Sequence, residues 1–154
     1  MKLVILTKSK EETMKLGEKL AQGLFLKAVI TLSGDLGAGK TTLVAGVAKG
    51  LKIEEIVTSP TFNILKCYFH KPLSLFHIDA YRLDGVNKDI GLEEFIDGDG
   101  VTMIEWPNYI EEMIPLDFLE VIIRNLGNDK RELTFISHGV KHDQLLSFLG
   151  ENKI

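Results

Sequence analysis

The pattern of hydrophobic and polar positions in the first third of the chain indicates helix, strand and helix in turn. Leucines recur at every fourth position within Ser9–Leu26, and this one-sided stripe predicts a helix. Ser9 and Glu12 have the spacing of a capping box, which supports a helix start at that point. The apolar run Ala28–Ser33 suits a buried strand, and Lys40–Leu51 is predicted to be a second helix.

Short apolar runs separated by turn residues dominate the rest of the chain. Pro72 falls in the first of these turns, where its missing N–H is harmless. The turn Gly127-Asn128-Asp129 joins two runs that form a predicted hairpin. The expected elements are strands over Phe62–Phe69, Leu73–Asp79 and Val101–Glu105, short helices over Ile90–Ile96 and Pro107–Met113, a hairpin of Phe118–Asn125 with Lys130–Ser137, and a helix over His142–Leu149.

Helices interleaved with short strands predict an α/β fold of the three-layer sandwich type, with helices on both faces of a sheet. The two hairpins add antiparallel pairs, so the sheet is expected to be mixed and only partly parallel. With 154 residues, of which 45% are hydrophobic, the chain suits a single domain over residues 1–154.

Charge and hydropathy narrow the classes of function. The apolar start Met1–Leu6 is too short for a secretory signal, and charged residues follow it at once. No segment approaches the roughly 18 apolar residues that cross a membrane, so a cytoplasmic protein without a membrane partner is expected. The net charge of −4 lacks the basic excess of most nucleic-acid-binding proteins, so any RNA is expected to be held by a partner.

A phosphate-binding loop is the strongest chemical signal. Gly34–Thr41 matches G-x-x-x-x-G-K-[ST] in full, between a predicted strand and a predicted helix. Gly37 and Gly39 allow backbone conformations that point N–H groups toward phosphate oxygens. Lys40 adds a positive charge for the β and γ phosphates, and the Thr41 hydroxyl suits Mg²⁺. The loop therefore predicts Mg²⁺-ATP as the ligand. The next residue, Thr42, either contacts the α-phosphate or only caps the helix, and the nucleotide contact is favoured.

Two predicted strands end in carboxylates, which P-loop enzymes use to orient Mg²⁺. Asp79 and Glu105 both fall at the carboxyl edge of the expected sheet, where α/β proteins bind ligands. Glu105 is expected to help hold Mg²⁺, directly or through water, and Asp79 to orient either the metal shell or the attacking water.

Hydroxyl side chains surround Pro60 in the segment Thr58–Phe62. Ser59 and Thr61 could reach the γ-phosphate and its metal, as switch loops do. An ordinary turn with local Ser and Thr hydrogen bonds explains the same residues equally well.

The chain resembles the TsaE family, the ATPases of bacterial tRNA threonylcarbamoyladenosine synthesis. The resemblance extends over most of the chain, and the motifs occur in the family's order and spacing. The matching segments are Gly34–Leu43, Ser59–Phe62, His77–Leu83 and Ile104–Pro107.

This resemblance implies a mixed α/β P-loop fold with weak intrinsic ATP hydrolysis. It also implies binding to a complex of TsaB and TsaD, which modifies an adenosine beside the anticodon, so that tRNA is reached only through the partners. The residues that match the family's phosphate site are Leu36, Gly37, Ala38, Gly39, Lys40 and Thr41, and the metal would be held by Thr41 and Glu105. The resemblance also implies a switch-like loop at Ser59–Thr61 and a catalytic role for Asp79. It places Trp106 near the nucleotide or the partner and Arg131 near the base, with a looser nucleotide contact near Lys10–Thr13.

Three other functions are consistent with parts of the sequence. A small-molecule kinase is the main alternative, but it usually carries an Arg-rich lid, and the arginines here are widely spaced. A GTPase is disfavoured because Asn87–Ile90 lacks the Asp of a guanine-reading Asn-Lys-x-Asp motif. A nucleotide-gated adaptor, whose output is binding, overlaps the ATPase interpretation.

The remaining reactive side chains favour structural roles. His138 and His142 have the spacing of a zinc pair, but no Cys or further His accompanies them. His77 is expected to pack beside Asp79, and Cys67 to be a buried, inert thiol.

Overall fold

A mixed sheet with helices on its faces forms the molecule, and this computed structural model describes residues 1–35, 37–60, 63–83 and 91–152. The strands are β1 (Lys2–Thr7), β2 (Val29–Ser33), β3 (Leu65–Tyr68), β4 (Ser74–Asp79), β5 (Gly100–Glu105), β6 (Phe118–Gly127) and β7 (Lys130–His138). The helices are α1 (Lys10–Gln22), α2 (Lys40–Gly50), α3 (Leu92–Ile96) and α4 (Val140–Asn152), with 3₁₀ helices η1 (Tyr81–Leu83), η2 (Pro107–Tyr109) and η3 (Glu111–Met113).

The sheet topology brings the functionally important strand ends to one edge. The strand order is β1-β7-β6-β2-β5-β4-β3 in the described part of the chain. Strand β2 lies parallel to β5 and β6, and β5 lies parallel to β4, whereas the β3–β4, β6–β7 and β1–β7 pairs are antiparallel. The predicted mixed sheet is therefore confirmed, and the carboxyl ends of β2, β4 and β5 meet at the same edge.

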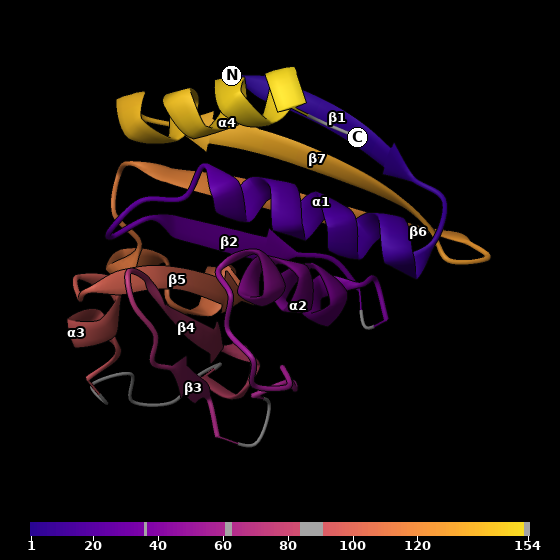
Figure 1. The fold of residues 1–154 in the computed structure, drawn as a ribbon. Coiled ribbons are helices and arrows are strands. Elements are labelled where there is room, and N and C mark those ends of the chain that lie inside the picture. The colour runs from indigo at the N-terminus through magenta and orange to yellow at the C-terminus, as the bar shows by residue number, and fades with distance from the viewer. Residues whose placement is uncertain (36, 61–62, 84–90, 153–154) are drawn as a thin grey trace.

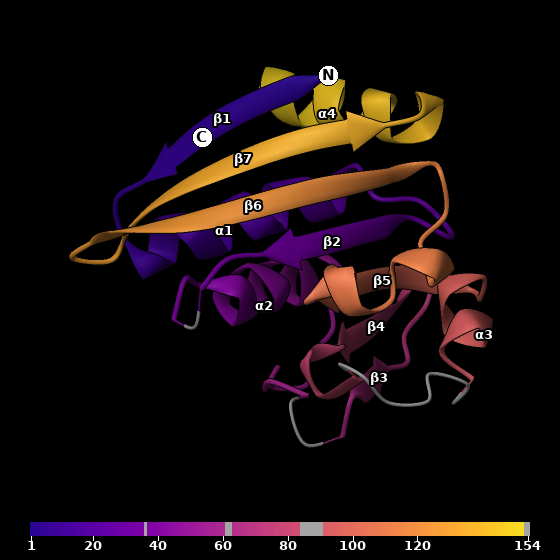
Figure 2. The same ribbon diagram turned by 180° about the vertical axis from the view of Figure 1, so that it is seen from behind.

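Helices cover the two faces of the sheet to different extents. Helices α1, α2 and α4 lie on one face and share one buried cluster with the strands beneath them (Figure 1). On the other face, α3, η2 and η3 lie near β4, β5 and β2, whereas the described helices leave β6, β7 and β1 uncovered (Figure 2). Val4 and Leu6 on this open part are 48% and 62% exposed.

Glycines allow α1 and α2 to touch backbone to backbone. A Cβ atom added at Gly46 would lie 2.2 Å from the Met14 carbonyl oxygen, and one at Gly17 would lie 2.6 Å from the Leu43 carbonyl oxygen. Because a real Cβ never comes so close, only glycine permits this spacing at these positions. The contact holds the first turns of α2 against the core.

Both predicted capping residues cap the start of α1, but Glu12 bonds the N–H of Lys8 and not that of the N-cap Ser9. The Ser9 hydroxyl accepts a hydrogen bond from the Glu12 backbone N–H at 3.1 Å, and the Glu12 carboxylate accepts one from the Lys8 N–H at 3.2 Å. The helix ends at Gln22, earlier than the predicted Leu26, and Gly23 follows as the C-cap.

Several other boundaries differ from the prediction. Strand β1 was not predicted, because Met1–Leu6 lacks a clear alternation of apolar and polar residues. The predicted helix Pro107–Met113 is divided into η2 and η3, since Ile110, with φ −136°, interrupts the helical backbone. Cys67 is half-buried, and burial raises the pKa of its thiol. Positions 62 and 90, where two predicted elements begin, lie outside the described residues.

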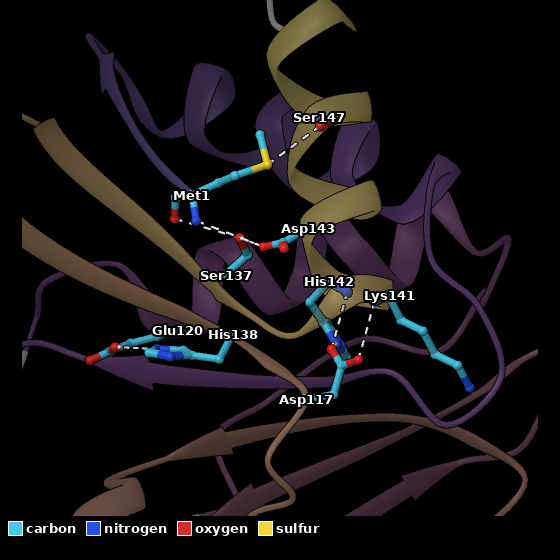
Figure 3. Close-up of polar contacts among 9 residues, drawn as sticks. All are labelled: Met1, Asp117, Glu120, Ser137, His138, Lys141, His142, Asp143 and Ser147. Atoms are coloured by element: carbon cyan, nitrogen blue, oxygen red, sulfur yellow. Dashed lines mark hydrogen bonds and ion pairs between the residues drawn. The ribbon is translucent and has the colours of Figure 1, made fainter.

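The C-terminal helix is fastened to the sheet by one aspartate and one histidine (Figure 3). Asp117 accepts hydrogen bonds from the backbone N–H groups of Lys141 and His142 and from His142 Nδ1. On its other side, the His142 ring accepts a hydrogen bond from the Val29 N–H at 3.2 Å, which ties α4 to β2. His138 bonds Glu120 instead, so different carboxylates hold the two histidines of the supposed zinc pair. Among the described helices, none is both long and apolar enough to span a bilayer.

Candidate functional site

The loop from β2 to α2 has the backbone of a phosphate cradle. Gly37 and Gly39 have φ values of +78° and +105°, in the left-handed region that favours glycine. Gly39 is the N-cap of α2 and has no side chain to cap the helix, so the positive end of the helix dipole is open to an anion. The loop therefore presents the feature that an anionic phosphate would recognise.

A pocket of about 300 Å³ opens over this loop. It gathers side chains from the P-loop, from the ends of β4 and β5, from the start of β7 and from the first turn of α1. Its lining residues are Lys10, Gly37, Gly39, Lys40, Thr41, Thr42, Ser59, Asp79, Glu105, Trp106 and Arg131. Most predicted site residues thus come together, while Leu36 and Thr61 lie outside the described residues.

The Lys40 ammonium is oriented by the loop itself. Its Nζ donates a hydrogen bond to the Gly34 carbonyl at 2.7 Å and lies 4.4 Å from the centroid of the Trp106 ring. The side chain is 6% exposed, so its charge is largely shielded from water and would act strongly on a phosphate in the pocket.

The two predicted carboxylates end neighbouring parallel strands. Asp79 pairs with Glu105 in the β4–β5 register, and both residues are 4% exposed. Asp79 Oδ1 accepts a hydrogen bond from the Tyr81 N–H at 3.0 Å, and Glu105 Oε2 lies 2.6 Å from His77 Nε2. His77 is therefore a partner of Glu105, a role that sequence reasoning missed when it placed this ring only beside Asp79.

The donor set suits Mg²⁺ bound together with a nucleotide. Thr41, Asp79 and Glu105 line the same pocket and offer the hard oxygen donors that Mg²⁺ prefers. Within the described ranges, no cluster of three or more His, Cys, Asp or Glu residues is placed to hold a metal. Mg²⁺ in nucleotide sites needs no such cluster, because one or two carboxylates, water and phosphate oxygens complete its shell.

Arg131 supports the P-loop from β7. Its Nε donates to the Ala38 carbonyl at 2.7 Å and its Nη2 to the Gly37 carbonyl at 3.3 Å, while Nη1 bonds Asn125 and the Lys130 carbonyl. These bonds hold two loop carbonyls toward the hairpin. The predicted contact of Arg131 with the base stays a prediction, because the observed partners are protein groups.

The remaining predicted residues take varied positions. Ala38 is buried, and its N–H donates to the Asp35 carbonyl at 3.0 Å across the loop. Trp106 has the left-handed φ of +57° and packs against Tyr81, with 5.0 Å between ring centroids. Lys10 lines the pocket, and the looser nucleotide contact near Lys10–Thr13 stays a prediction.

Comparison with known proteins agrees with this architecture. The family model described as Threonylcarbamoyl adenosine biosynthesis protein TsaE matches residues 7–133. A Bacillus subtilis (strain 168) relative, named tRNA threonylcarbamoyladenosine biosynthesis protein TsaE, is 42% identical over 146 residues, covering 95% of this chain and 92% of the relative. A Treponema pallidum protein of the same name is 38% identical over 130 residues, covering 83% of this chain and 96% of the relative.

A solved structure shows the same fold. The crystal structure of YdiB from Bacillus subtilis superimposes with a TM-score of 0.84 at 38% sequence identity, covering 98% of this chain and 95% of that chain. With the family model and these relatives all in agreement, the chain belongs to the TsaE family of tRNA threonylcarbamoyladenosine biosynthesis proteins.

Proposed function

We propose that this chain is a Mg²⁺-dependent ATPase that supports a TsaB–TsaD complex in forming threonylcarbamoyladenosine next to the anticodon of tRNA, in the cytoplasm. The observation that carries the proposal is the meeting of a P-loop and two strand-terminal carboxylates in one pocket. Family membership connects that pocket to tRNA modification.

Different side chains of the pocket bind the nucleotide, hold the metal and orient the reacting groups. The P-loop backbone and Lys40 bind the triphosphate, and Thr42 contacts the α-phosphate. Thr41 and Glu105 hold Mg²⁺, which when bound neutralises charge on the phosphate oxygens. Asp79, held by the Tyr81 N–H, orients the metal shell or the attacking water.

The loop and aromatic residues at the rim complete the proposed site. Ser59 lines the pocket and reaches the γ-phosphate as part of a switch-like loop. Trp106 lies over Lys40 and beside Tyr81, which is 52% exposed. An exposed aromatic surface beside the nucleotide would give TsaB–TsaD a place from which to influence turnover, and we expect the chain alone to hydrolyse ATP weakly.

Phosphate release from ATP tests the proposal. It would be measured for the chain alone, with TsaB–TsaD, and with TsaB–TsaD and tRNA. We expect slow, Mg²⁺-dependent hydrolysis that rises with the partners and is lost in Glu105→Ala. Glu120→Ala is the matched control, because this carboxylate pairs with His138 outside the pocket.

Different failures would remove different parts of the proposal. Normal hydrolysis by Glu105→Ala would refute the catalytic assignment. Absence of both stimulation and complex formation would refute the partner assignment and leave nucleotide binding standing.

A further inference from the structure

We propose that His77 is a positioning residue that fixes the Glu105 carboxylate for the Mg²⁺–nucleotide complex. The inference rests on the proposed function of the pocket and assigns a role to a side chain outside the predicted ligand set. It stands on three observations: a short buried hydrogen bond, an unpartnered ring nitrogen and the strand register.

The contact between the His77 and Glu105 side chains is short and buried. His77 Nε2 and Glu105 Oε2 are 2.6 Å apart, and the two side chains are 0% and 5% exposed. A carboxylate that binds a cation has no proton to give, so in the proposed role Nε2 carries the proton and donates it to Glu105. Such charge-assisted bonds are stronger than neutral ones and hold their partners in a narrow range of geometries.

The other ring nitrogen shows that His77 is not simply a satisfied core residue. Among the described protein atoms, none forms a hydrogen bond with the buried Nδ1 of His77. A buried polar atom without a partner destabilises a fold, and an apolar side chain at this position would avoid that cost. The reason for a histidine at position 77 is therefore the hydrogen bond between Nε2 and Glu105.

The strand register explains why this bond orients the carboxylate. His77 and Asp79 lie on the same face of β4, and Asp79 is opposite Glu105 on β5. The Glu105 side chain thus leans back along the sheet to reach His77. One carboxylate oxygen is held there, which leaves the other for a metal or its bound water. Hydrogen bonds to metal-binding carboxylates and histidines orient these ligands in the same way in other metal sites.

The chain contains a natural comparison for this pair. His142 Nδ1 lies 2.6 Å from Asp117 Oδ1, so this pair also joins an imidazole nitrogen to a carboxylate oxygen at the same distance, although Asp117 is 35% exposed and the second His142 nitrogen accepts from the Val29 N–H. That pair fastens the start of α4 and lies outside the residues that line the pocket. Substitution of His142 should therefore disturb stability without changing the response to Mg²⁺.

The test compares His77→Leu, which removes the donor, with His77→Gln, whose side-chain amide can restore an N–H near the Nε2 position. Affinity for a non-hydrolysable ATP analogue would be measured by calorimetry without Mg²⁺ and across a Mg²⁺ titration. We expect His77→Leu to raise the Mg²⁺ concentration for half-maximal tightening roughly 10–100-fold. Mg²⁺-free affinity should stay unchanged, and His77→Gln should recover most of the response.

Other outcomes separate the two levels of the proposal. If the wild-type protein binds the analogue equally with and without Mg²⁺, the proposed function fails. If the wild-type protein responds to Mg²⁺ and His77→Leu responds equally, or loses Mg²⁺-free and Mg²⁺-bound affinity in parallel, only the positioning role fails.

A measurement on the unaltered protein covers the case in which His77→Leu does not fold. Nitrogen-15 NMR of the imidazoles should show a protonated Nε2 in His77, with a resonance that shifts when Mg²⁺ and the analogue bind, while His142 stays unchanged. An unprotonated Nε2, or a His77 resonance that does not respond, would overturn the assignment.

Discussion

Three charged side chains that line the pocket are each held by a protein group. Lys40 bonds the Gly34 carbonyl, Glu105 faces His77, and Asp79 accepts the Tyr81 N–H. Groups fixed in this way need little reorganisation when charge develops on a substrate, which is the main source of electrostatic stabilisation in enzymes.

Arg131 gives a prediction at the residue scale. Arg131→Ala removes the bonds to the Gly37 and Ala38 carbonyls, so the loop should lose the conformation that binds phosphate. A hydrogen bond from a charged group contributes about 1.5–3 kcal/mol, so calorimetry should show affinity for the ATP analogue weakened by about 10–100-fold.

Arg124→Ala is the matched control for this variant. Arg124 lies on the neighbouring strand β6, its side chain is 68% exposed, and it pairs with Glu132 at 3.5 Å, so nucleotide affinity should not change. Wild-type affinity in Arg131→Ala would show that the loop holds its shape without this side chain.

The sequence predicted the residues whose chemistry depends on a local motif or a strand end. Lys40, Thr41, Asp79 and Glu105 belong to this group, and all of them line the pocket. The bond of Arg131 to Ala38 joins residues 93 positions apart, and the bond of His77 to Glu105 depends on the pairing of β4 with β5. No local pattern contains such information, so only the fold reveals these two contacts.

At the scale of elements, strong local signals gave accurate predictions and weak ones did not. Helix α2 follows directly from the P-loop motif, and the β6–β7 hairpin follows from its turn residues. Strand β1 depends on pairing with β7 at the far end of the sequence, and its outward Val4 and Leu6 hide the alternation. This strand therefore forms because of its pairing with β7 and not because of its local sequence.

The contact of α1 with α2 gives a prediction at this scale. Gly46→Ala places a Cβ against the Met14 carbonyl and forces the helices apart, so the free energy of unfolding should fall by about 1–3 kcal/mol in urea titration. Gly150→Ala in α4 is the control, because its Cβ would meet only Leu3 at 3.9 Å. That change should stabilise by up to about 1 kcal/mol through helix propensity. Equal stability of Gly46→Ala and the wild-type protein would contradict the close packing.

For the molecule as a whole, the attachment of the C-terminal helix makes the free energy of unfolding depend on pH. Burial lowers the pKa of His142 by disfavouring its charged form, and this effect outweighs the opposing hydrogen bond and charge of Asp117. Burial alone would raise the pKa of Asp117, but its hydrogen bonds from the His142 ring and from the Lys141 and His142 backbone lower it.

Both shifts predict loss of stability on the acid side. The pKa of histidine in the unfolded chain is about 6.5. Because the pKa of His142 is lower in the folded protein, the free energy of unfolding is unaffected above about pH 6.5 and falls as the pH drops through that value. The contribution of Asp117 is lost only below about pH 4. The free energy of unfolding should therefore be lower at pH 5.5 than at pH 7.5, with a smaller difference in His142→Gln. A wild-type stability that rises toward pH 5.5 would contradict this attachment.

The central claim is that the loop between β2 and α2 holds a triphosphate with its backbone and Lys40. The most direct test is calorimetric titration of the wild-type protein and Lys40→Ala with a non-hydrolysable ATP analogue and Mg²⁺, after circular dichroism has shown that both are folded. Saturable binding by the wild-type protein, weakened at least about tenfold in Lys40→Ala, is the predicted result. No binding by the wild-type protein, or equal affinity in the two proteins, would contradict the account.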